Sequence, residues 1–133
     1  MTTQEKFYRI IGAAMQVYNE VGYGLSEPIY QECLSIVCDE MDIPFEREKT
    51  LEMVFHQQVL QKKYIADFIC YGDIIVELKA VENLTNDHRA QLFNYMRITS
   101  ISCGVLINFG NPNRIITERY IFDSLTNRFR FIK

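Results

Sequence analysis

The sequence has little of what several common functional classes require. It contains 2 histidines, so a metal site built from several histidines is excluded. Its 4 cysteines form no CxxC pair and lie beside apolar residues, which favours buried, reduced thiols over a disulfide framework or a zinc knuckle. The net charge of −3 supplies no overall basic field, so attraction to nucleic acid would need a local basic patch or bound cations.

Signals for export and for membrane insertion are also missing. Residues 1–6 lack the basic and then apolar layout of a signal peptide, and no apolar run is long enough to cross a bilayer. We therefore expect a soluble, cytoplasmic protein. The 133 residues are 48% hydrophobic and contain no composition shift, repeat or low-complexity linker, which predicts a single domain over residues 1–133.

Two amphipathic helices are predicted in the first third of the chain. Apolar residues recur at spacings of three and four from Phe7 to Val21, and Gly22-Tyr23-Gly24 ends the pattern. Ser26 is the expected N-cap of a second helix, with Pro28 tolerated in its first turn. This second helix should end near Asp42.

The rest of the chain predicts a mixed sheet with one more helix. Segments rich in β-branched and aromatic residues indicate strands. The expected strands lie at residues 45–55, 59–71, 74–79, 101–108, 114–122 and 128–132. The first three should form an antiparallel meander, and a helix capped by Thr85 or Asn86 should cross over to the fourth. The fold class is therefore a mixed α/β sandwich in which two N-terminal helices precede the meander.

A carboxylate and an ammonium interrupt the apolar strand at residues 74–79. Side chains alternate along a strand, so Glu77 and Lys79 share a face, and Asp67 in the preceding strand is a candidate for the same cluster. Buried charges need partners, water or a metal. Carboxylate oxygens suit magnesium, and a nearby lysine can assist the attacking water or the phosphorane anion. The pattern predicts phosphodiester hydrolysis, with Glu27 as a further candidate ligand.

The competing interpretation is an ion pair on a solvated face of the sheet, which would have to explain why the strand is otherwise aliphatic. The hairpin register separates the two. A two-residue turn at residues 72–73 would place Asp67 opposite Leu78, on the wrong face for Glu77. A three-residue loop over residues 71–73, or one bulge, would place Asp67 opposite Glu77. The site therefore requires the odd register.

Residues 24–30, Gly-Leu-Ser-Glu-Pro-Ile-Tyr, resemble the signature for which the GxxExxY proteins are named. The other matching elements are the Asp67 strand, residues 76–82, Gln91 and Tyr95 on the following helix, and residues 106–110. The chain thus resembles the GxxExxY family of the PD-(D/E)XK nuclease superfamily, which implies a restriction endonuclease-like core. Ala66 stands before Asp67, where the superfamily name expects proline.

The resemblance also implies roles for individual residues. It implies metal ligands at Asp67, Glu77 and the Leu78 main-chain carbonyl, a catalytic lysine at Lys79, a helix-borne acid at Glu27 that is both catalytic and a metal ligand, and substrate-binding residues at Gln91 and Tyr95, which resemble the QhxxY element of RecB-like nucleases. The implied cofactor is Mg²⁺ or Mn²⁺.

The implied substrate is nucleic acid, with DNA as the first expectation, and a homodimer is expected if two strands must be cut. Because the same fold hosts inactive proteins, two alternatives stay open. One is a catalytically silent module that binds nucleic acid or a protein partner, and the other is a hydrolase of smaller phosphate esters.

Overall fold

The computed structural model describes residues 1–132. Its helices are α1 (Thr3–Val21), α2 (Glu27–Glu40) and α3 (Asn86–Thr99). Its strands are β1 (Phe45–Leu51), β2 (Val54–Phe55), β3 (Gln58–Val59), β4 (Tyr64–Cys70), β5 (Ile74–Lys79), β6 (Cys103–Asn108), β7 (Ile116–Asp123) and β8 (Arg128–Ile132). Within the described residues, no helix is long and apolar enough to span a membrane.

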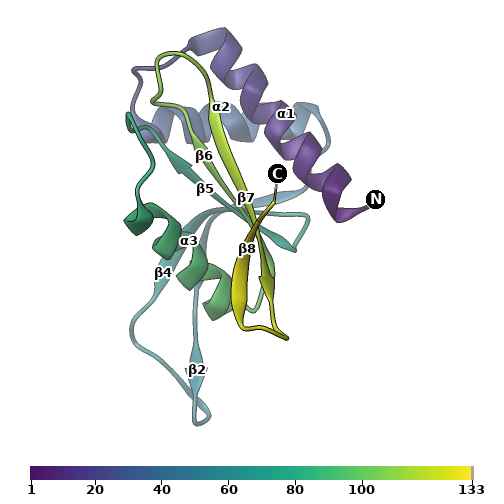
Figure 1. The fold of residues 1–133 in the computed structure, drawn as a ribbon, viewed down its shortest axis with the longest axis vertical. Helices are drawn as coiled ribbons and strands as arrows, with labels where there is room; N and C mark the ends of the chain where they lie inside the picture. The colour runs from purple at the N-terminus through teal and green to yellow at the C-terminus, as the bar shows by residue number, and fades with distance from the viewer. Residues whose placement is uncertain (133) are drawn as a thin grey trace.

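Six strands form one mixed sheet in the order β1-β4-β5-β6-β7-β8 (Figure 1). Strands β5 and β6 are parallel and are joined through α3, whereas the other neighbouring pairs of this sheet are antiparallel. Strand β6 lies between β5 and β7, which confirms the central place predicted from its apolar sequence. The mixed α/β class and the helix crossover are confirmed as well.

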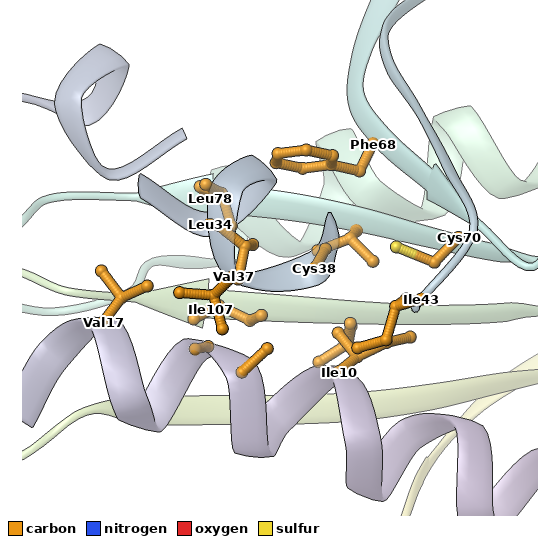
Figure 2. Close-up of a cluster of buried hydrophobic side chains, with 14 of the residues drawn as sticks. Ile10, Val17, Leu34, Val37, Cys38, Ile43, Phe68, Cys70, Leu78 and Ile107 are labelled. Atoms are coloured by element: carbon orange, nitrogen blue, oxygen red, sulfur yellow. The ribbon is translucent and has the colours of Figure 1, made fainter. Parts of the chain in front are cut away.

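The sheet lies between two helical layers, and Figure 1 shows α1 and α2 on one face and α3 on the other. In Figure 2, Ile10 of α1 and Leu34 of α2 lie in the same apolar cluster as Leu78 and Ile107 of the sheet. On the α3 face, Ile75 belongs to a second cluster, together with residues of α3 and β6. Strand β5 is therefore buried on both faces, which explains its aliphatic run.

The predicted strands at residues 45–55 and 59–71 are each interrupted, which corrects their expected bounds. Strand β1 ends at Leu51 and β4 begins at Tyr64. Between them, residues 52–63 are all exposed and form an arm that contains the β2–β3 hairpin and projects from the sheet (Figure 1). The strand-forming composition continues through this arm although the core does not, so propensity alone could not locate the break.

Helix α3 is positioned by its N-cap, which is Thr85 and not Asn86. Thr85 Oγ1 accepts a hydrogen bond from the His88 N–H, and His88 Nδ1 accepts one from the Thr85 N–H. This reciprocal capping box satisfies two backbone donors and fixes where the helix starts.

The loop that follows β5 is held by the end of β6. The buried Asn108 accepts hydrogen bonds from the N–H groups of Val81 (3.0 Å) and Gly110 (3.1 Å), and its amide nitrogen donates to the Val81 carbonyl (2.8 Å). A Cβ added to Gly110 would lie 2.3 Å from the Val81 carbonyl oxygen and 2.4 Å from the Val81 nitrogen. The close backbone approach therefore requires glycine at this position.

Replacing Gly110 with alanine should destabilise the protein by about 1–3 kcal/mol, because the atoms in the way belong to the backbone and cannot rotate aside. Gly12 is the matched control, since it lies on the exposed side of α1 with nothing within 4 Å of an added Cβ. Gly12→Ala should stabilise by up to about 1 kcal/mol through its higher helix propensity. Urea unfolding measures both effects, and wild-type stability in Gly110→Ala would show that this loop relaxes freely.

Candidate active site

Strands β4 and β5 pair in the odd register that the site requires. Cys70 lies opposite Ile74, so residues 71–73 form a three-residue connection. The same register, continued along the strands, places Asp67 opposite Glu77. The geometric condition derived from the sequence is met.

The two strands stop pairing through their backbones at this point, and the two carboxylates take the place of backbone partners. The Asp67 N–H donates to Glu77 Oε2 at 2.7 Å, and the Leu78 N–H donates to Asp67 Oδ2 at 2.8 Å. On the other side of β4, the pairing with β1 skips the Asp67 position, where the facing Glu48 has a φ of 50°. The sheet is therefore irregular on both sides of Asp67, as bulged strands next to functional sites often are.

The backbone N–H and C=O of Leu78 also face the gap between β4 and β5. The Lys79 carbonyl accepts a hydrogen bond from the Phe109 N–H on the β6 side. Successive residues of a strand direct their peptide groups to opposite edges, so the N–H and C=O of Leu78 face β4. The contact of the Leu78 N–H with Asp67 agrees with this. The Leu78 carbonyl therefore points towards β4, the strand that carries Asp67.

Helix α3 brings two polar side chains to this end of β5. Lys79 Nζ donates to Gln91 Oε1 at 2.7 Å. Tyr95 lies one turn further along the same face of α3 and is 5% exposed. Burial raises the pKa of Tyr95, and the negative charges of Glu77 and Asp67 raise that pKa further. The helix that was expected to serve the site thus faces the acids and the lysine.

Glu27 approaches from α2, on the opposite helical layer. It is the first residue of the helix after the N-cap Ser26, a position where the helix dipole favours a carboxylate. Burial raises the pKa of Glu27, the Asp67 carboxylate raises that pKa further, and the Lys79 ammonium opposes both. Glu27 is therefore close enough to both groups to interact with their charges.

Tyr30, the last residue of the same sequence signature, has a structural role. Its ring stacks on Phe109 with centroids 4.5 Å apart, and its hydroxyl donates to the Gly22 carbonyl. The Leu25 N–H donates to the same hydroxyl. Tyr30 thereby fixes the loop that leads into α2, and so fixes the place where Glu27 begins the helix.

The acids outnumber the cation beside them. Glu77 is 3% exposed, and its burial raises its pKa well above the ordinary value, with the Asp67 charge adding to the effect. Burial also raises the pKa of Asp67, although the hydrogen bond from Leu78 and the charge of Lys79 oppose it. One ammonium cannot balance three carboxylates whose charges interact, so the site favours the uptake of protons or of a metal ion.

The donor set fits a hard divalent cation, because it consists of carboxylate and carbonyl oxygens. Among residues 1–132, no three histidine, cysteine or acidic side chains are already grouped as a metal cage. Magnesium suits such a partial set, since it keeps several waters and is usually held by one or two carboxylates.

Gln31 contacts the candidate site although no sequence pattern singled it out. It is 7% exposed, its Nε2 donates to Asp67 Oδ1 at 3.2 Å, and its Oε1 accepts from Arg47 Nε at 2.9 Å. The available signal was its spacing, because Gln31 follows Glu27 by four positions and therefore lies on the same face of α2.

Comparison with known proteins supports the fold described above. A solved structure described as the crystal structure of SSO0001 matches with a TM-score of 0.56 and 24% identity, over 70% of this chain and 48% of that chain. This chain therefore spans less than half of that protein, and the likeness concerns the fold alone. No curated protein matches the chain.

A family model described as the PD-(D/E)XK nuclease superfamily matches residues 4–120. With the six-stranded mixed sheet, the match identifies the fold as restriction endonuclease-like. Assignment to the GxxExxY proteins within it stays a prediction. Because the model covers most of the sequence, the chain belongs to the PD-(D/E)XK nuclease superfamily.

Proposed function

We propose that the protein is a metal-dependent nuclease that hydrolyses phosphodiester bonds in DNA. The observation that carries the proposal is the pair of carboxylates, Asp67 and Glu77, in the gap between β4 and β5. Lys79 lies two residues after Glu77 on β5. Membership of a nuclease superfamily supports hydrolysis of a nucleic acid. A binding module without chemistry would not need one buried and two half-buried acids beside a single lysine.

Asp67, Glu77 and the Leu78 carbonyl would hold Mg²⁺ or Mn²⁺, with Glu27 as a further carboxylate. The bound ion would polarise the phosphate and a water molecule. Because the chain has a net charge of −3, a cation at this site would also offset the repulsion between the protein and a polyanion.

Lys79 has the chemistry to assist the attack. Its ammonium has three N–H donors, and Gln91 occupies one of them. The other two can hold the attacking water or stabilise the charge that develops on the phosphate. Gln91 and Tyr95, one turn apart on the same face of α3, would contact the substrate strand. If both strands of a duplex are cut, two copies of the chain would act together.

Asp67→Asn and Lys79→Ala should each reduce DNA cleavage by about 100-fold or more, because an amide offers no anionic ligand and alanine no ammonium. Mg²⁺ or Mn²⁺ titration with labelled DNA measures cleavage, and calorimetry measures metal binding. Lys79→Ala should still bind the metal, whereas Asp67→Asn should bind it weakly. The matched control is Asp73→Asn, an exposed turn carboxylate paired with Lys6, which should cleave like the wild type.

RNA and a small phosphodiester are assayed in parallel with DNA. Cleavage of RNA alone would redirect the substrate, and hydrolysis of the small ester alone would favour a phosphoesterase. Metal binding without cleavage of any of these substrates would contradict the nuclease proposal and favour a silent binding module.

Glu77→Gln should gain stability relative to the wild type as the pH rises. Burial raises the folded-state pKa of Glu77, so this group favours folding at low pH, and its contribution is lost as the pH rises through that raised pKa. Glutamine still accepts the hydrogen bond from the Asp67 N–H but does not titrate. Urea unfolding in metal-free buffer, from the ordinary pKa of glutamate upward, measures the difference. If the difference in unfolding free energy between Glu77→Gln and the wild type does not change with pH, burial does not raise the pKa of Glu77.

A further inference from the structure

Arg47, on the edge strand β1, is connected to the candidate active site through Gln31. Arg47 Nε donates to Gln31 Oε1 at 2.9 Å, and Gln31 Nε2 donates to Asp67 Oδ1 at 3.2 Å. Side chains from β1, α2 and β4 thus form one chain of hydrogen bonds. It ends on a carboxylate that faces Glu77 across the gap between the strands.

The direction of these hydrogen bonds follows from the chemistry of the groups. A guanidinium has only donors, so Gln31 has to present its oxygen to Arg47 and its nitrogen to Asp67. Gln31 is 7% exposed, whereas Arg47 is exposed. This series of hydrogen bonds is therefore buried at Gln31 and exposed to solvent at Arg47.

The two terminal amino groups of the Arg47 guanidinium can still bind an anion. Within residues 1–132 it makes no ion pair, although Glu46 and Glu48 flank it in the sequence. Glu46 pairs instead with Lys49 at 2.8 Å. With Nε engaged, the two terminal amino groups of Arg47 form a fork that matches two oxygens of a phosphate group.

We propose that Arg47 binds a backbone phosphate of the nucleic acid substrate, and that Gln31 links this contact to the orientation of Asp67. The inference rests on the proposed nuclease function. A polyanion that approaches an acidic site needs positive charge beside it, and Arg47 supplies that charge within two hydrogen bonds of Asp67. Gln31 is a positioning residue that acts through Asp67.

The phosphate contact is tested by the binding of fluorescein-labelled DNA in Ca²⁺ at several salt concentrations, measured by fluorescence anisotropy. Arg47→Ala should weaken binding about tenfold and reduce the slope of log Kd against log salt by about one, since one phosphate contact is lost. Arg47→Lys should keep the slope but recover only part of the affinity, because it lacks the fork. Lys49→Ala removes an exposed charge from the same strand and should behave as the wild type.

The positioning role of Gln31 is tested by metal binding without substrate. Gln31→Met keeps the volume but removes the hydrogen bond to Asp67, and should lower the Mg²⁺ affinity about 10-fold to 100-fold by calorimetry. A glutamine that only stabilises the fold would change the urea midpoint and leave the metal affinity as it is, which would overturn this role.

The outcomes separate this inference from the function on which it rests. If the wild type binds DNA and Arg47→Ala matches it in affinity and salt slope, the inference is wrong and the proposed function stands. Equal losses in Arg47→Ala and Lys49→Ala would indicate general surface charge and would also overturn it. Failure of the wild type to bind DNA with any divalent metal would overturn both.

Discussion

At Asp67 the antiparallel pairing of β4 with β5 gives way to two hydrogen bonds between side chains and backbone. Buried N–H groups need acceptors, and here the acceptors are the carboxylates of Glu77 and Asp67 themselves. Loss of either acceptor would leave a buried amide unpaired, at a cost of about 1–3 kcal/mol. The acids therefore hold the sheet together at the place where they meet, and the geometry of the site and the stability of the sheet depend on the same contacts.

The rest of the fold supports these hydrogen bonds between the carboxylates and the backbone. Strand β5 is buried on both faces, which holds its backbone in place and also removes Glu77 from water, so that its pKa rises. Asn108 and Gly110 fix the chain just beyond Lys79. Helices α2 and α3 then deliver polar groups from opposite layers. The charges of the site are thus carried by strands and helices that pack against the two apolar clusters, which favours a preorganised arrangement.

Sequence reasoning recovered the parts that depend on local pattern. The aliphatic run and the alternation of Glu77 with Lys79 predicted a buried strand with a charged face. The register could be stated only as a condition, because Gly72-Asp73 also suits a two-residue turn, and the structure resolves the choice by placing Tyr71 at a φ of 57°. The exposed arm and the Gln31 contact depend on where the core ends and on which elements meet, and local composition carries neither.

The signature over residues 24–30 combines two physical roles. Tyr30 is fully buried and ties the loop before α2 to Phe109, whereas Glu27 begins α2 with a carboxylate whose pKa responds to the charges of Asp67 and Lys79. Gln31 lies just outside the signature and yet makes the direct contact with Asp67. A motif therefore marks the residues that build a site's support as well as those that face it. The hydrogen bonds that leave the site, such as the one to Gln31, show how far the site extends into the surrounding structure.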